Sequence, residues 1–270
     1  MKEDEQTEEN EQTESVDTEL KVEKLLAEEM STARQAYEKL LEVSETWQKE
    51  NATRLSTWKR GIAVSEAKAR SYFTLEQLPE DAVLDLWEKL NAAVEAENSY
   101  EAMQEMLSEY KAYGKIRDQV QLTRLYFALS GVARLAKAQL EPERLETAGQ
   151  DWEHSICPVC GEETRLALLA PPVGKRYRFC QTCGHEWATK RVGCILCGSE
   201  QASEQNYLHS EEYPGVEIVV CHNCGDYFKE FDLREHALAD YVWEDMRTLP
   251  LNFAAEQWLA EAAKTSGKLS

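Results

Sequence analysis

The chain has 270 residues and a formal net charge of -20 at pH 7, from 50 acidic and 30 basic side chains. This length allows two domains, and the negative charge repels phosphate backbones, which argues against a nucleic-acid-binding protein. The sequence has neither a basic start followed by an apolar core nor an apolar run long enough to span a bilayer. We therefore expect a cytoplasmic protein without membrane insertion.

The first 19 residues are strongly acidic, with nine Asp and Glu residues against one lysine. Such a segment cannot bury enough apolar surface to fold alone, so residues 1–19 are expected to form a disordered tail. The tail could bind a partner, although a purely solvating extension is the preferred interpretation.

Residues 20–150 are predicted to form an all-helical domain, because the composition from Val22 to about Leu140 is rich in Ala, Glu, Leu and Lys. One helix should begin near Pro79, since proline and the acidic residues after it favour a first turn. Gly114 should separate two further helices. Two apolar stripes recur at helical spacing: Val83, Leu86, Trp87, Leu90 and Val94, and then Val120, Leu125, Leu129, Val132 and Leu135.

The three tryptophans Trp47, Trp58 and Trp87 are interpreted as core residues of the helical domain. Exposed tryptophans would be candidate hot spots for a partner, but aromatic residues on amphipathic helices are more often buried. The polar segment 141–150 contains Gly149, and the domain boundary is expected near it.

All eight cysteines lie after this boundary, in four Cys-x-x-Cys-Gly motifs, here called knuckles and numbered in chain order. Two thiolates separated by two residues reach one metal ion when the backbone turns tightly, and the glycine permits the left-handed conformation that closes the turn. The candidate metal ligands are Cys157, Cys160, Cys180, Cys183, Cys194, Cys197, Cys221 and Cys224.

The spacing between knuckles predicts how they pair. Nineteen residues separate the first knuckle from the second and 23 separate the third from the fourth, whereas only ten lie between the second and the third. Loops of 19 and 23 residues suit a hairpin of the zinc-ribbon or rubredoxin-like kind. We expect two metal ions, iron or zinc, each held by four thiolates; structural disulfides are the alternative, and nothing in the sequence indicates an oxidising compartment. His154, His185 and His222 lie near knuckles and are interpreted as bystanders.

Residues 151–232 are predicted to form two tandem four-cysteine modules, each with one hairpin. The first hairpin joins 166–169 to 176–179, and the second joins 206–209 to 216–220. Alternation places Tyr177 and Phe179 on one face, over a knuckle, and Arg176 and Arg178 on the other. Six basic residues between 165 and 191 could dock an acidic partner, lie near the thiolates, or form a solvated strand face: Arg165, Lys175, Arg176, Arg178, Lys190 and Arg191.

Residues 233–270 should form a C-terminal helix and tail, with Leu233, Leu238, Tyr241, Val242 and Leu249 on the apolar face. Pro250 is expected to end or kink this helix. The helix is predicted to fold back over a metal knuckle. The complete prediction is an α+β fold in which an N-terminal helical domain precedes two rubredoxin-like or zinc-ribbon modules and a C-terminal helix.

Four motifs resemble those of the FdhE-type formate dehydrogenase accessory proteins: CPVCG from Cys157, RYRFCQTCGHEW from Arg176, VGCILCGS from Val192 and CHNCGDYFKEFDLRE from Cys221. The resemblance covers about 152–258 well and is only architectural in the helical half. It departs at His185, where the family more often has threonine, and at residues 188–189, where His and Val are frequent. The positions that match are the eight cysteines and, with uncertain role, Tyr177, Trp187, Tyr227 and Lys229.

The resemblance implies a cytoplasmic, non-enzymatic maturation factor that binds the catalytic subunit of formate dehydrogenase and is associated with iron. Two other functions stay open: a thiol-redox or electron-transfer protein that uses the Cys-x-x-Cys pairs, and, less favoured, a nucleic-acid-binding zinc ribbon. Ligand identity does not separate iron from zinc, because four thiolates accept either metal.

Overall fold

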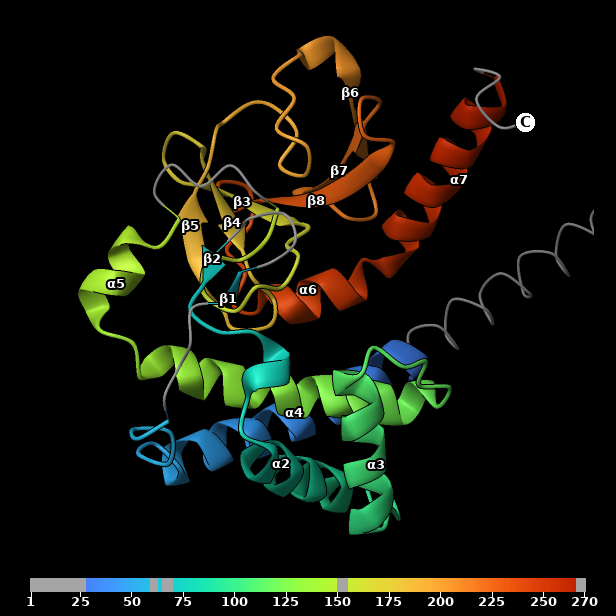
Figure 1. Cartoon of the computed structure of the whole chain (residues 1–270). Coiled ribbons are helices and arrows are strands. Elements are labelled where there is room, and N and C mark those ends of the chain that lie inside the picture. The colour runs from blue at the N-terminus through green and yellow to red at the C-terminus, as the bar shows by residue number, and fades with distance from the viewer. Residues whose placement is uncertain (1–27, 59–62, 65–69, 150–154, 266–270) are drawn as a thin grey trace, which may run out of the picture.

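The computed structural model describes residues 28–58, 63–64, 70–149 and 155–265. The predicted acidic tail and His154 lie outside these residues. The described chain has a lower layer of helices and an upper six-stranded sheet, with two C-terminal helices beside the sheet (Figure 1). This architecture confirms the α+β prediction. Among the described residues, no helix combines the length and the apolarity required to cross a bilayer.

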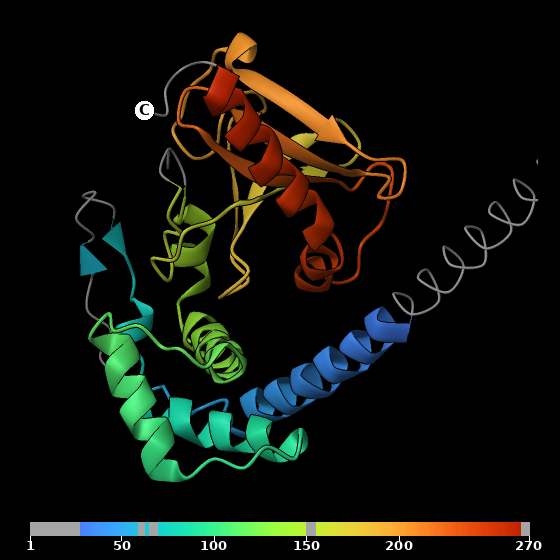
Figure 2. The ribbon, with the colours of Figure 1, turned by 90° about the vertical axis from the view of Figure 1, so that its right-hand side faces the viewer.

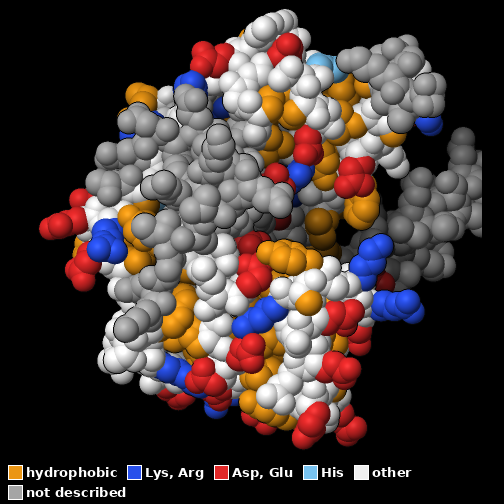
Figure 3. Space-filling view, in the orientation of Figure 1, with side chains coloured by type: hydrophobic (Ala, Val, Ile, Leu, Met, Phe, Trp, Pro, Cys, Tyr) orange, Lys and Arg blue, Asp and Glu red, His pale blue; other side chains and the backbone are white. Residues whose placement is uncertain are grey.

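The helical layer consists of a helix over 28–50, α2 (Glu80–Ala93), α3 (Tyr100–Lys111) and α4 (Gln119–Ala138), and the short α5 (Pro142–Thr147) leads out of it. Between the first two helices lie the two-residue strands β1 (Ala63–Val64) and β2 (Arg70–Ser71) and the 3-10 turn η1 (Leu75–Gln77). Acidic side chains are scattered over this layer in the view of Figure 3.

Local signals in the sequence account for the helix starts. As predicted, α2 begins directly after Pro79 and carries two acidic residues in its first turn. The side chain of Ser99 accepts a hydrogen bond from the Ala102 amide at the start of α3, and Asp118 does the same for α4. Gly114 lies between α3 and α4, as expected.

The two predicted apolar stripes form most of the helical core. Every member of the first stripe is buried except Val94, which is partly buried, and Leu125, Leu129, Val132 and Leu135 of the second are buried. Val120 is an error of the prediction: it is 60% exposed, in the first turn of α4. Trp47 and Trp87 are fully buried, and Trp58 is partly buried, with its ring edge against Phe73.

At Gly131, α4 lies close to α2 and to the helix over 28–50. A Cβ atom on Gly131 would lie 2.5 Å from Cδ2 of Leu86 in α2 and 2.6 Å from Oγ of Ser44 in the helix 28–50. We therefore expect Gly131→Val to lower the free energy of unfolding by about 1–3 kcal/mol through overpacking. Urea unfolding followed by circular dichroism measures the change, and Ser130→Val on the same helix is the control for helix propensity. Equal stabilities of the two variants would contradict the close crossing.

The sheet joins both predicted hairpins. Its strands are β3 (Leu166–Ala170), β4 (Lys175–Phe179), β5 (Glu186–Ala188), β6 (Gln205–His209), β7 (Val216–Cys221) and β8 (Asp226–Asp232), in the order β5-β4-β3-β8-β7-β6. The hairpins β3–β4 and β6–β7 form as predicted, and the 3-10 turn η2 (Ala202–Glu204) precedes the second. β8 pairs antiparallel with β7 and parallel with β3, so that it connects the two hairpins.

The C-terminal region differs in part from its prediction. Leu233 and Leu238 are not helical, because the chain forms β8 and then a loop before α6 (Tyr241–Arg247) begins. The side chain of Asp240 accepts hydrogen bonds from two amides in the first turn of α6. The expected break near Pro250 is present, since α7 (Leu249–Thr265) starts after a break at Thr248. α7 then lies across the sheet (Figure 2) and contacts β7.

Candidate metal centres

The four knuckles repeat one backbone turn. In each, the glycine amide donates a hydrogen bond of 2.8–3.0 Å to the carbonyl oxygen of the first cysteine. The glycines have φ between +66° and +77°, a conformation that side-chain-bearing residues rarely adopt. In the first and third knuckles, an amide also donates to the sulfur of the first cysteine, from Val159 to Cys157 and from Leu196 to Cys194, both at 3.4 Å. The turn therefore aims both sulfurs of a knuckle to one side.

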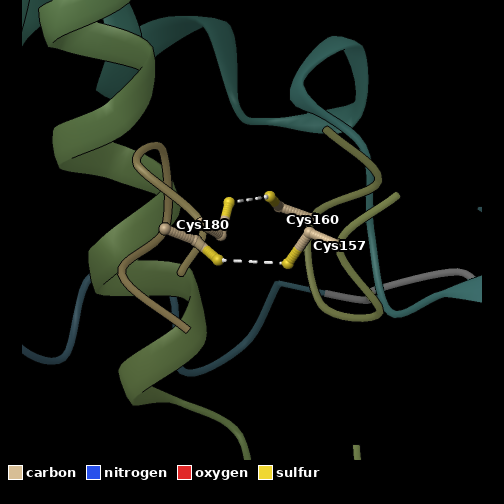
Figure 4. Close-up of side chains that lie close together, drawn as sticks. Cys157, Cys160 and Cys180 are labelled. Carbon is tan, nitrogen blue, oxygen red and sulfur yellow. Dashed lines mark hydrogen bonds between the residues drawn. The ribbon is translucent and has the colours of Figure 1, made fainter. Parts of the chain in front are cut away.

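The structure brings the eight cysteines together in two groups of four, paired as the loop lengths predict. The first cluster consists of Cys157, Cys160, Cys180 and Cys183, and the second consists of Cys194, Cys197, Cys221 and Cys224. Within each cluster the sulfur atoms all lie within 4.8 Å of one another. Figure 4 shows the sulfurs of the first two knuckles facing one another across the first cluster.

The sulfur separations fit a tetrahedral metal ion. Across facing knuckles of the first cluster, the sulfurs of Cys160 and Cys180 are 3.5 Å apart and those of Cys157 and Cys183 are 3.6 Å apart. In the second cluster the pairs Cys194–Cys224 and Cys197–Cys221 are each 3.8 Å apart. A tetrahedron with metal–sulfur bonds of about 2.3 Å has sulfur–sulfur edges of about 3.8 Å, whereas a disulfide bond measures about 2.05 Å. Both clusters could therefore hold iron or zinc through four thiolates.

The first cluster is part of the helical core. Its four cysteines are at most 1% exposed and belong to the same buried cluster as the core residues of α2 and α4. Two cations of α4 donate to carbonyl oxygens of the second knuckle: Arg134 to those of Gln181 and Thr182, and Lys137 to that of Gly184 at 2.7 Å. Burial raises the pKa of the Cys157 thiol, while hydrogen bonds from the neighbouring thiols lower that of Cys180.

The fourth knuckle of the second cluster forms the turn between β7, which ends at Cys221, and β8, which starts at Asp226, and the cluster is open to solvent. Cys194 and Cys221 are buried, but Cys197 and Cys224 are exposed. Burial raises the pKa of the Cys194 thiol to about 11. For Cys197, partial burial is outweighed by hydrogen bonds, including one from Nδ2 of Asn223 at 3.4 Å, which lower the pKa to about 7.

The strand β4 presents two buried arginines toward the second cluster. Arg176 is 1% exposed; it pairs with Glu230 of β8 at 2.6 Å and donates to the Gly193 carbonyl, next to Cys194, at 2.8 Å. Arg178 is 2% exposed; burial lowers the pKa of its guanidinium to about 10, and the neighbouring Cys194 partly offsets this effect. These two members of the basic band therefore lie toward the thiolates and do not form a solvated strand face.

The aromatic residues of β4 occupy the opposite face, but not where they were expected. Phe179 makes an edge-on contact with Tyr241 of α6, at 5.0 Å between ring centroids, and Tyr177 packs into the same apolar cluster. The prediction that this pair covers a metal knuckle is wrong, because the C-terminal helices cover this face of the strand. α7 does reach a knuckle, since Trp258 contacts His222 edge-on at 5.2 Å.

The described histidines lie outside both clusters. His185 stacks on Trp187 at 5.7 Å, and its Nε2 is 3.1 Å from the carbonyl oxygen of Ala148, while His222 contacts Trp258. Lys229, a motif residue without an assigned role, is 3% exposed and pairs with Asp245 of α6 at 2.6 Å. Lys229 also donates to Thr248 at the break between α6 and α7. Sequence reasoning missed Glu230, which follows Lys229 between the buried Phe228 and Phe231.

Known proteins are similar to this chain in sequence and in fold. A protein named FdhE homolog from Edwardsiella ictaluri is 30% identical over 203 residues, which cover 74% of this chain and 61% of that protein. An FdhE homolog from Aquifex aeolicus is 30% identical over 124 residues, or 45% of this chain and 41% of the relative. The crystal structure of the FdhE protein from Pseudomonas aeruginosa matches with a TM-score of 0.51 and 19% identity, over 82% of this chain and 90% of that one. No protein-family model matches the chain.

The fold and the two clusters define a metal-binding protein in which zinc-ribbon-like four-cysteine modules are joined to a helical region. The sequence relatives and the shared fold together identify its family. The chain belongs to the FdhE family. It spans between about two fifths and three fifths of the lengths of the Aquifex and Edwardsiella relatives.

Proposed function

We propose that this chain is a cytoplasmic accessory factor for the formation of active formate dehydrogenase and that it binds the catalytic subunit of that enzyme. The observation that carries the proposal is the 30% identity to an FdhE homolog over 203 residues, together with the motifs around the four knuckles. The proposal divides the chain into four segments: the acidic tail (1–19), the helical domain (20–150), the four-cysteine modules (151–232) and the C-terminal helix and tail (233–270).

In this proposal the eight cysteines are ligands and not catalysts. Each cysteine lies in a four-sulfur group whose geometry fits a metal ion, so ligation would use every thiol of the chain. A thiol-redox enzyme needs a dithiol that is free to attack a substrate, and metal ligation would occupy all such pairs. The metal ions, iron or zinc, stabilise the surface that the catalytic subunit recognises.

Affinity capture from the native host tests the partner. The tagged chain is expected to recover the formate dehydrogenase catalytic subunit, and a tagged Cys221→Ser variant is expected to lose both one metal ion and the partner. In a strain that lacks the chain, formate dehydrogenase activity should fall while the amount of the catalytic subunit stays the same. A reproducible absence of the catalytic subunit from the wild-type capture would overturn the proposal.

A further inference from the structure

The two clusters differ in how far solvent reaches their cysteine residues. In the first cluster all four cysteines are buried, with exposures of 0–1%. In the second cluster Cys197 and Cys224, the second cysteine of each knuckle, are exposed. Two of the four cysteines of the second cluster can therefore be approached from solvent in the folded protein.

The surroundings of the knuckle glycines give an independent view of the same difference. At Gly161 an added Cβ atom would lie 3.1 Å from Oγ of Ser71, and at Gly184 it would lie 3.7 Å from Nζ of Lys137. At Gly198 and Gly225 such an atom would meet nothing among the described residues within 4 Å. Both knuckles of the first cluster thus abut the helical half, whereas the turns of the second cluster project from the molecule.

A cavity of about 690 Å³ adds a second approach to the third knuckle. Its lining includes Cys194, Ile195 and Gly198 of that knuckle, and Arg178. The exposed sulfurs and this cavity flank the same cluster. Arg178 is a buried cation beside a site whose four thiolates and one divalent ion would carry a net charge of -2.

These differences determine how a bound ion could leave. A competing ligand would remove an ion from such a site only if it could approach the thiolates that hold the ion. The exposed Cys197 and Cys224 would permit this approach in the folded protein. A ligand can reach the first cluster only after the helical core opens locally. This opening costs a substantial part of the free energy that stabilises the core.

We infer that the second cluster is an exchange site, at which a soft divalent ion such as Zn²⁺ or Fe²⁺ enters and leaves the folded protein, while the first cluster is a permanent structural site. The inference goes beyond the proposed function and does not depend on the identity of a partner. It assigns Cys197 and Cys224 as the ligands that an incoming thiol or chelator displaces first.

Metal release from the full-length chain loaded with two Zn²⁺ ions tests the inference. The zinc-loaded protein is mixed with an excess of 4-(2-pyridylazo)resorcinol, and the absorbance of the zinc complex is followed together with far-ultraviolet circular dichroism. One ion per chain is expected in a fast phase that leaves the helical signal unchanged. The second ion should be released at least about 100-fold more slowly, the factor that an opening free energy of about 2.7 kcal/mol gives.

A matched variant and a chemical probe assign the phases. Cys197→Ser should bind one Zn²⁺ ion, keep the helical signal and lose the fast phase. Mass-spectrometric mapping after brief treatment of the wild-type zinc-loaded protein with iodoacetamide should find Cys197 and Cys224 modified before Cys157 and Cys160. Release of both ions in a single phase would overturn the inference, and so would earlier modification of the first cluster.

Discussion

Cys157→Ser is expected to unfold the helical half together with the first cluster. Cys157 is fully buried in the same core as Trp87 and Leu129, and the Phe73 amide donates a backbone hydrogen bond of 3.1 Å to the carbonyl oxygen of Val159 in the same knuckle. A structural four-ligand zinc site contributes about 10 kcal/mol or more of binding free energy. This contribution is comparable to the entire stability of a domain, which is roughly 5–15 kcal/mol. Loss of the first metal should therefore remove most of the helical structure.

Circular dichroism at 222 nm, the metal content per chain and tryptophan fluorescence measure this effect. The matched control is Cys224→Ser, which makes the same chemical change at an exposed ligand of the second cluster. We expect the control to lose one metal ion and to keep its helical signal and the buried environment of Trp47 and Trp87. A Cys157→Ser protein that binds one metal ion with a wild-type helical spectrum would show that the first cluster does not support the helical core.

Short-range features of this fold could be predicted from the sequence because their causes are local. The knuckles pair as expected, since loops of 19 and 23 residues suit hairpins and the glycines close each turn. The start of α2 at Pro79 and the break before Pro250 follow from the properties of proline in the same way. Each of these features depends on residues that are close together in the chain.

The features that were missed depend on pairings between distant segments. β3 lies parallel to β8, with Leu166 opposite Lys229, and no local pattern specifies a partner 63 residues away. Because of this pairing, residues 226–232 form the central strand β8, whereas the sequence predicted that they lead into the C-terminal helix. It also explains why Arg176 of β4 is buried, because β8, on the far side of β3, carries its ion-pair partner Glu230. The difference in exposure between the clusters depends on the same tertiary arrangement, since all four knuckles share the Cys-x-x-Cys-Gly pattern.

Breaking the buried ion pair between Arg176 and Glu230 is expected to have the second largest effect. The two side chains are 0% and 3% exposed, and the Arg176 Nε–Glu230 Oε2 distance is 2.6 Å. Removal of one partner leaves a buried charge without its counter-ion, which costs about 3–5 kcal/mol. Replacement of both by apolar residues of similar volume removes the charge as well as the partner and often costs little. We therefore expect Glu230→Leu and Arg176→Met each to lower the free energy of unfolding by about 3–5 kcal/mol, and the double variant to lower it by much less than the sum.

Urea unfolding of the wild-type protein, both single variants and the double variant gives the coupling energy directly. The hydrogen bond from Arg176 to the Gly193 carbonyl is lost in both variants that lack the arginine, so it cancels in the cycle. That bond holds the residue before Cys194, and its loss should also accelerate metal release from the second cluster in both of these variants but not in Glu230→Leu. Single variants that each lose less than about 1 kcal/mol would show that solvent reaches this pair, because exposed ion pairs contribute no more than that.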